Sequence, residues 1–218
     1  MVRNHIIKSL ITLKKPDSII AEQFETIRTN LEFSAFETKA KAILITSPTR
    51  NEGKTLAVTN LAFSFAKQGK SVLLIDTDVR KGKLHEIFKL KNDVGLTNIL
   101  IGQVSYREAI IRTHSSKVDV LTSGPVPSNT ERLFSSDAMV EFIEKVKAIY
   151  DYVIFDSLPI LEGADTKTIA SRCDGVIMVV RNGKTERELA IEAKAVVDVV
   201  KANMIGVIFN GKSKSLFS

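Results

Sequence analysis

The stretch that decides the fold reads Ala42-Ile43-Leu44-Ile45-Thr46, followed by Ser47-Pro48-Thr49-Arg50-Asn51-Glu52-Gly53-Lys54-Thr55. The first five residues form a continuous apolar run, which is typical of a strand covered on both faces of a parallel sheet. Residues 55–67 then carry apolar side chains at helical spacing and stop before Gly69, a suitable residue to end a helix. A strand, a loop ending in Gly-Lys-Thr and a helix together predict a phosphate-binding loop.

The residues of this loop have separate physical roles in binding a nucleotide. Backbone N–H groups of the loop and of the helix N-terminus bind phosphate oxygens. Gly53 allows close approach of the backbone, Lys54 reaches the outer phosphates, and the Thr55 hydroxyl binds Mg²⁺. The usual leading glycine is Pro48 here, and Asn51 stands where many such loops keep a glycine. Asn tolerates positive φ better than most residues, so the sequence still predicts nucleotide binding.

Five more apolar runs alternate with helical patterns along the chain. The expected strands are 72–75, 118–121, 152–155, 175–180 and 205–209, and the expected helices include 20–33, 137–148 and 186–202. Strand–helix alternation of this kind predicts a three-layer α/β fold, with a mostly parallel central sheet, helices on both faces and right-handed crossovers.

Acidic residues follow two of these runs. Asp76 and Asp78 end the second strand, and Asp156 ends the strand 152–155. The carboxyl ends of parallel strands form the crevice in which such folds bind ligands. We therefore expect these carboxylates beside the phosphate loop, where Asp156 holds the Mg²⁺ shell. Asp76 and Asp78 lie two residues apart, so one can help to hold the metal and the other can accept a hydroxyl proton or orient a water.

Composition and charge exclude several classes of protein. The 218 residues are 44% hydrophobic and 26% charged, as in a soluble globular domain. A single cysteine rules out an intramolecular disulfide framework and fits a reducing cytoplasm. The net charge of +6 is concentrated in a basic N-terminal arm, whereas the rest of the chain mixes both signs, so we expect no nucleic-acid partner. No stretch is apolar enough to span a bilayer or to act as a signal peptide, which predicts a cytoplasmic protein or one held at a membrane by another.

Three motifs together resemble the bacterial tyrosine kinases of capsule and exopolysaccharide operons, with their Walker A, A′ and B motifs. The motifs are Gly53-Lys54-Thr55, the run from Leu73 to Arg80 that ends Asp-Thr-Asp-Val-Arg, and the run from Val153 to Ser157. Segments 21–30, 123–129 and 205–212 resemble the family's N-terminal oligomerisation helix, its Gly-Pro-x-Pro-Pro-Asn loop and its late strand ending in Asn. The resemblance runs from about residue 15 to residue 212.

The resemblance implies an ATP-dependent protein-tyrosine kinase that uses ATP and Mg²⁺. It implies a basic arm with an oligomerisation helix over 1–36 and a P-loop kinase domain over 37–218. Its implied catalytic residues are Lys54, Asp76, Asp78 and Arg80, and its implied metal ligands are Thr55, Asp76 and Asp156. The implied nucleotide contacts are Arg50, Asn51, Glu52, Gly53, Lys54, Thr55, Leu56 and Asn210.

The resemblance also implies partners. They are a transmembrane activator of the chain-length-regulator type, protein substrates with tyrosine, and further copies of the chain in a ring. The activator would hold the protein at the inner face of the plasma membrane. The tyrosine cluster that the family carries at its C-terminus is missing, since the only tyrosines are Tyr106, Tyr150 and Tyr152. This absence predicts weak autophosphorylation, centred on Tyr106.

Two other functions remain open at this point. A ParA/MinD-type ATPase has the same kind of fold, but such proteins carry a second lysine early in the loop, near Thr49 here. A catalytically weak ATP-binding regulator of polysaccharide export would act through binding alone, and the missing tyrosine cluster favours it.

Overall fold

The computed structural model describes residues 10–38, 40–113 and 117–211, and for residues 34–38 it describes the backbone only. Most of the predicted basic arm and the residues after 211 lie outside these ranges. Among the described residues, no helix combines the length and the hydrophobicity needed to cross a membrane.

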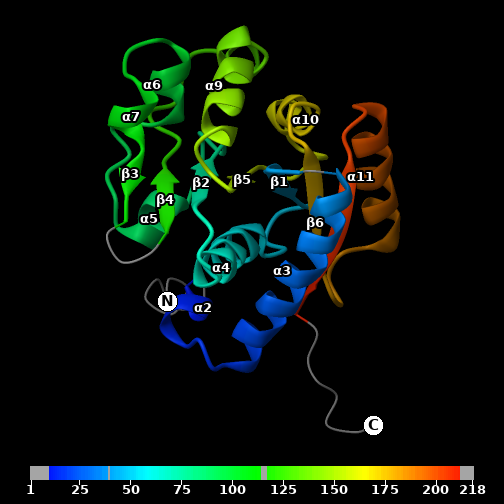
Figure 1. Cartoon of the computed structure of the whole chain (residues 1–218). Coiled ribbons are helices and arrows are strands. Elements are labelled where there is room, and N and C mark those ends of the chain that lie inside the picture. Colours follow the sequence, from blue (N-terminus) through cyan, green and yellow to red (C-terminus); the bar gives the residue numbers. More distant parts are fainter. Residues whose placement is uncertain (1–9, 39, 114–116, 212–218) are drawn as a thin grey trace, which may run out of the picture.

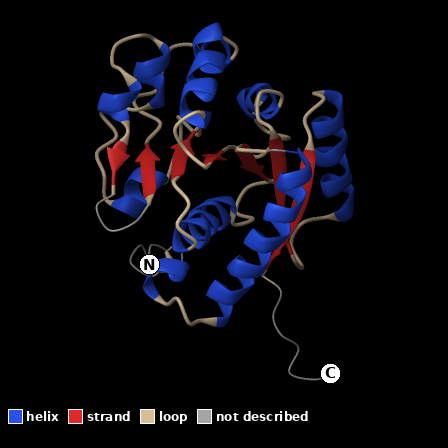
Figure 2. Cartoon of the chain, viewed as in Figure 1, coloured by secondary structure: helices blue, strands red, loops and turns tan. Residues whose placement is uncertain are grey.

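A seven-stranded sheet forms the middle layer (Figures 1 and 2). Its strands are β1 (Ala42–Thr46), β2 (Val72–Asp76), β3 (Ile111–Arg112), β4 (Val118–Leu121), β5 (Tyr152–Asp156), β6 (Gly175–Arg181) and β7 (Met204–Asn210). Their order is β3-β4-β2-β5-β1-β6-β7, and every neighbouring pair is parallel except β3 with β4. The predicted fold class is confirmed. The two-residue strand β3 was not predicted, because it is too short to show a periodicity.

Helices cover both faces of the sheet, as Figure 2 shows. They are α2 (Ile11–Lys14), α3 (Ile19–Thr38), α4 (Lys54–Lys67), α5 (Leu84–Phe88), α6 (Leu96–Leu100), α7 (Tyr106–Ala109), α8 (Thr130–Phe134), α9 (Asp137–Lys147), α10 (Ala164–Ala170) and α11 (Arg187–Val199). One apolar core includes side chains of α3, α4 and α5, and the other includes side chains of α6, α9, α10 and α11. The inner strands contribute to both cores, which explains why they are apolar throughout.

The N-terminal helix α3 packs on its own chain. Phe24 and Leu31 are buried in the same core as the α4 side chains, and Glu25 forms an ion pair with Lys67 of α4. The apolar side of this helix therefore packs within the chain, which the sequence alone did not reveal.

The topology places the predicted site at one edge of the sheet. Strands β2, β5 and β1 are adjacent, and Asp76 lies opposite Asp156 in the β2–β5 register. Ile45, near the end of β1, lies opposite Asp156 on its other side. The phosphate loop and the acidic strand ends consequently meet at the carboxyl edge.

Candidate active site

The loop between β1 and α4 has the backbone that a phosphate site requires. Asn51 and Gly53 have positive φ angles of 62° and 100°. A Cβ atom on Gly53 would lie 2.1 Å from Nδ2 of Asn210, so any larger residue at this position would displace the Asn210 side chain. The structure therefore brings Asn210, from the far end of the chain, against the loop, as its predicted role in the nucleotide site requires.

Lys54 lies at the first position of α4, and its Nζ donates a hydrogen bond to Oγ of Ser47, 2.9 Å away. Burial lowers its pKa, while the nearby carboxylates of Asp156 and Glu52 act in the opposite direction. A partly desolvated ammonium group that lies near these acids is suited to bind an anionic phosphate.

Asp156 is the buried acid at the end of β5. Burial raises its pKa to about 6, while a hydrogen bond from the Thr55 side chain and the charge of Lys54 act to lower it. Its Oδ1 atom is buried and has no hydrogen-bond partner. A buried carboxylate oxygen without a partner, beside a hydroxyl group, is the donor set that Mg²⁺ accepts.

Asp76 is buried at the end of β2 and shapes the next loop. Its Oδ1 accepts from the Asp78 N–H at 3.1 Å, and its Oδ2 accepts from the Leu84 N–H at 3.0 Å. Burial, together with the charge of Asp156, raises its pKa well above the usual range. A Cβ atom on Gly82 would lie 2.5 Å from Oδ2 of Asp76, so this loop closes over the carboxylate only because Gly82 has no side chain.

Asp78 is half-buried at the same edge, and its Oδ1 accepts from the N–H groups of Arg80 and Lys81. Among the described residues, nothing donates a hydrogen bond to its Oδ2. Arg80 is exposed at the surface next to it. The two aspartates thus differ: Asp76 is enclosed by backbone donors, whereas Asp78 keeps one carboxylate oxygen available.

The other predicted nucleotide contacts in the loop differ in how exposed they are. Arg50 is exposed and pairs with Glu162, Asn51 is exposed, and Leu56 is half-buried. Glu52 is fully buried, so its side chain faces the protein.

Comparison with known proteins identifies the family of this chain. Residues 40–188 match the family model described as an AAA domain. The tyrosine-protein kinase YwqD of Bacillus subtilis is 43% identical over 97% of this chain and 89% of its own length. The tyrosine-protein kinase CpsD of Streptococcus agalactiae is 36% identical over 99% of this chain and 91% of its own length. The chain belongs to the bacterial tyrosine-protein kinases. The predicted family and enzyme class are confirmed.

Solved structures agree with this assignment. The kinase domain of Escherichia coli tyrosine kinase ETK superimposes with a TM-score of 0.91 at 29% identity, over 96% of this chain and 82% of that one. The MinD cell division protein of Aquifex aeolicus gives 0.65 at 26% identity, over 80% of this chain and 70% of that one. The alternative MinD-type function is therefore less well supported than the kinase.

The residues of this kinase fit a magnesium ion held with few protein ligands. Among the described residues, no group of three or more His, Cys, Asp or Glu side chains could hold a metal. Mg²⁺ does not require one, because it keeps several waters and binds through one or two carboxylates plus substrate phosphates. Asp156 and Thr55 supply such a set, with Asp76 opposite Asp156 on the adjacent strand.

Three residues at and just after the end of β6 join the kinase site without having been predicted. Nη1 of Arg181 donates to the Asn51 carbonyl at 3.2 Å, and Nζ of Lys184 donates to the Arg50 carbonyl at 2.7 Å. The Thr185 hydroxyl donates to Oε2 of Glu52 at 2.7 Å. The rule that identified the aspartates also applies here, because these residues lie at or just after the carboxyl end of a parallel strand.

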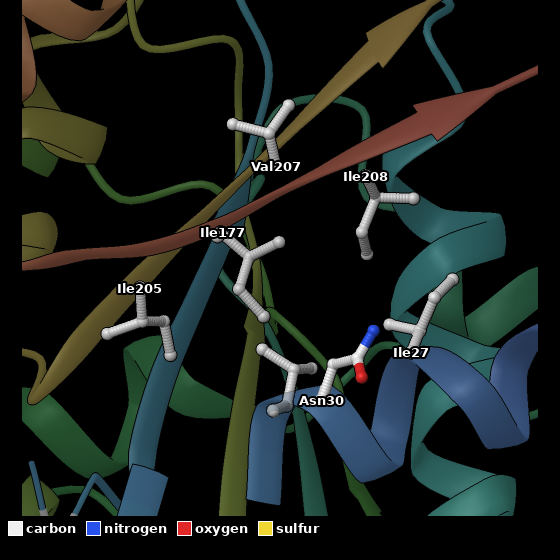
Figure 3. A pocket seen from close by; sticks show the side chains of 8 residues that line it. Ile27, Asn30, Ile177, Ile205, Val207 and Ile208 are labelled. Atoms are coloured by element: carbon white, nitrogen blue, oxygen red, sulfur yellow. The ribbon is translucent and has the colours of Figure 1, made fainter. Parts of the chain in front are cut away.

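An apolar hollow lies elsewhere in the kinase, between α3 and the strands β6 and β7. In Figure 3, Ile177 and Ile208 point toward Ile27 and Asn30 of α3, whereas Val207 points away. Its volume is about 110 Å³, and none of the predicted site residues lines it. The hollow is therefore separate from the nucleotide site.

Proposed function

We propose that this chain transfers the γ-phosphoryl group of MgATP to a tyrosine hydroxyl of another protein. The observation that carries the proposal is the meeting of three strand ends, which gathers Lys54, Thr55, Asp76, Asp78 and Asp156 at one edge of the sheet. Phosphoryl transfer depends mainly on positioning and charge neutralisation, and this set of groups supplies both.

The phosphate loop binds and orients the nucleotide. Lys54 places a positive charge beside the phosphate oxygens, and the N-terminus of α4 adds its dipole to the same site. Thr55, Asp156 and Asp76 would hold Mg²⁺, which when bound neutralises charge that develops on the phosphates. Two solved structures of cobyrinic acid a,c-diamide synthase, 21% identical to this chain, share the fold; one contains ADP and magnesium and the other an ATP analogue and magnesium.

Asp78 is the group best placed to take the proton of the tyrosine hydroxyl. Its Oδ1 is fixed by two backbone N–H groups, which leaves Oδ2 free to accept. Asp76 is too enclosed for this role, since backbone N–H groups occupy both of its oxygens. Arg80 follows Asp78 on the surface and would lie near the transferred phosphate.

We further propose that the kinase acts in capsule or exopolysaccharide synthesis, together with a transmembrane activator. One relative from Klebsiella pneumoniae is named for the cps region and is 32% identical over 95% of this chain. The chain covers 29% of that relative's length, so the relative has further segments. The chimerical protein CapA2B2 superimposes with a TM-score of 0.90 at 33% identity, over 94% of this chain and 91% of its own. Such an activator would hold the kinase at the inner face of the membrane and support its self-association.

The experiment that tests the proposal incubates the purified protein with radiolabelled ATP, Mg²⁺, the activator's cytoplasmic segment and a candidate tyrosine-containing protein. Phosphotyrosine that disappears in Lys54→Ala, and persists in Lys145→Ala on the exposed face of α9, supports the kinase. Phosphate release without phosphotyrosine would instead favour a MinD-type ATPase. Nucleotide binding without turnover would favour a regulator that acts by binding.

A further inference from the structure

A carboxylate is buried inside the phosphate loop, where an uncompensated negative charge would repel phosphate. Glu52 is 0% exposed. Its Oε1 accepts from the backbone N–H of Thr49 at 3.0 Å and from the Thr49 hydroxyl at 2.6 Å. Its Oε2 accepts from the Thr185 hydroxyl at 2.7 Å. Each carboxylate oxygen therefore has a donor, as burial of such a group requires.

The Thr185 hydroxyl is itself held in one orientation. It accepts a hydrogen bond from the Arg181 backbone N–H at 2.7 Å. Since its oxygen faces that N–H, its own proton is directed to Glu52. Glu52 thus ties the start of the phosphate loop, at Thr49, to the loop that follows β6.

The three consecutive carbonyls of this loop are all turned toward β6 and β7. The Arg50 carbonyl accepts from Lys184, the Asn51 carbonyl from Arg181, and the Glu52 carbonyl from Nδ2 of Asn210 at 2.7 Å. In a trans peptide, the N–H of the next residue points opposite to the carbonyl.

The N–H groups of Asn51, Glu52 and Gly53 must then point away from β6 and β7. Among the described residues, none of the three has a hydrogen-bond acceptor. Successive N–H groups aimed to one side form a concave site for an anion. The bonds to the carbonyls therefore determine where the phosphate-binding donors point.

We propose that Glu52 and Thr185 form a positioning latch, which holds the phosphate loop in its anion-binding shape before the nucleotide arrives. Glu52 acts through the backbone and not by side-chain contact with the nucleotide. The loop needs such support because Pro48 replaces the usual leading glycine and Asn51 is held at a positive φ of 62°, a costly conformation for a residue with a side chain. The inference rests on the proposed nucleotide binding.

The test measures the affinity for Mg²⁺–ADP by titration calorimetry, at a temperature at which each variant is folded by circular dichroism. Thr185→Val removes the hydroxyl and keeps the shape, and we expect it to weaken binding about tenfold, the size of one hydrogen bond to a charged group. Thr185→Ser restores the hydroxyl and should restore the affinity. Thr168→Val is the matched control, because the Thr168 hydroxyl bonds only to the Ala164 carbonyl within α10.

Glu52→Gln tests the same hydrogen bond at its acceptor. It keeps the volume of the side chain and removes one acceptor oxygen, so affinity should fall at least as far as in Thr185→Val. In the double variant, adding Thr185→Val to Glu52→Gln should lower the affinity for Mg²⁺–ADP little further. The hydrogen bond between Thr185 and Glu52 has already been disturbed by Glu52→Gln.

Three outcomes would overturn the latch. Thr185→Val and Glu52→Gln could bind Mg²⁺–ADP as tightly as the wild type. They could also lower the melting temperature alone and leave the affinity unchanged, which would make the bond merely structural. A wild-type protein that does not bind Mg²⁺–ADP would overturn the proposed function together with the latch, whereas the first two outcomes leave the proposed function intact.

Discussion

Asp156 and Asp76 are two buried carboxyl groups at the ends of adjacent strands, and the folded protein must accommodate their negative charges. Burial is the largest cause that raises the pKa of each, and in Asp76 the neighbouring Asp156 charge adds to it. Without metal, the ionised pair opposes folding. In the proposed Mg²⁺ site the same charges would serve as ligands, so the cost in stability would belong to the function.

This cost predicts a pH-dependent gain in stability for Asp156→Asn. The folded-state pKa of Asp156 is raised from 3.8 to about 6, so between these values the folded protein binds more protons than the unfolded chain. Stability should therefore fall as pH rises through this window, and the loss is complete above it. The variant removes this cost. Its advantage over the wild type in urea denaturation, without Mg²⁺ or nucleotide, should be larger at pH 8 than at pH 5, by on the order of 1 kcal/mol, because only about one pKa unit of the window lies above pH 5. Equal differences at the two pH values would contradict it.

Asp76, the last residue of β2, and Asp78, just after it, should differ in the effects of their substitution. Asp78→Asn should lower phosphoryl transfer at least 100-fold and barely change nucleotide affinity, because its free oxygen serves the hydroxyl nucleophile. Asp76→Asn should lower transfer and also change the melting temperature, because its carboxylate holds the backbone at Asp78 and Leu84. Labelling assays and thermal melts check both. Full activity in either variant would leave that aspartate only a structural role.

At the scale of elements, α3 is an integral part of the core. We expect Leu31→Ala to destabilise the protein by about 2–5 kcal/mol, because this side chain is only 5% exposed and packs in the core with α4. Phe33→Ala on the same helix should change stability by less than about 0.5 kcal/mol, because Phe33 is 72% exposed. Denaturant unfolding of both variants provides the measurement. A small effect of Leu31→Ala would mean that α3 is only loosely attached.

Because α3 packs in the core, a test of self-association through α3 needs a substitution at an exposed position of this helix. The Arg28 side chain is 12% exposed and pairs with Glu32, so Arg28→Glu would place two carboxylates together and weaken the fold itself. Glu22 is exposed on the outer face. We expect Glu22→Arg to lower the apparent mass in light scattering without changing the melting temperature. A wild-type protein that stays monomeric at tens of micromolar, with and without MgATP, would refute the association.

At the scale of the whole molecule, Tyr150 and Tyr152 lie at the opposite edge of the sheet from the site. Tyr152 begins β5, the strand that ends in Asp156, and Tyr150 lies two residues earlier. The Tyr150 hydroxyl donates to Asp119 at 2.8 Å, and the Tyr152 ring stacks on Phe65. Tyr106 opens α7 after Ser105 and is half-buried. A parallel strand of this length separates its two ends by roughly 13 Å, so no molecule can phosphorylate these strand-start tyrosines in its own site.

Autophosphorylation should therefore be weak, and it should centre on Tyr106. Tyr150 and Tyr152 are held by a hydrogen bond and by ring stacking, and burial raises the pKa of both. Tyr106→Phe should remove most of the phosphotyrosine signal seen with the protein alone, and leave phosphorylation of an added substrate unchanged. Mass spectrometry of the labelled protein checks this. A strong signal that survives in Tyr106→Phe would show that Tyr150 or Tyr152 becomes accessible.

The sequence alone determined the parallel α/β fold, the phosphate loop after β1 and the aspartates that end β2 and β5. These features are local, since an apolar run, a glycine or a strand-end acid can be recognised from the few residues around it. Only the tertiary structure decided which segments meet. It placed the α3 stripe in the protein's own core, turned the Glu52 carboxylate inward, and brought Thr185 and Asn210 against the loop. The contacts of Thr185 and Asn210 join residues more than a hundred positions apart, and no periodicity along the chain encodes such a pairing.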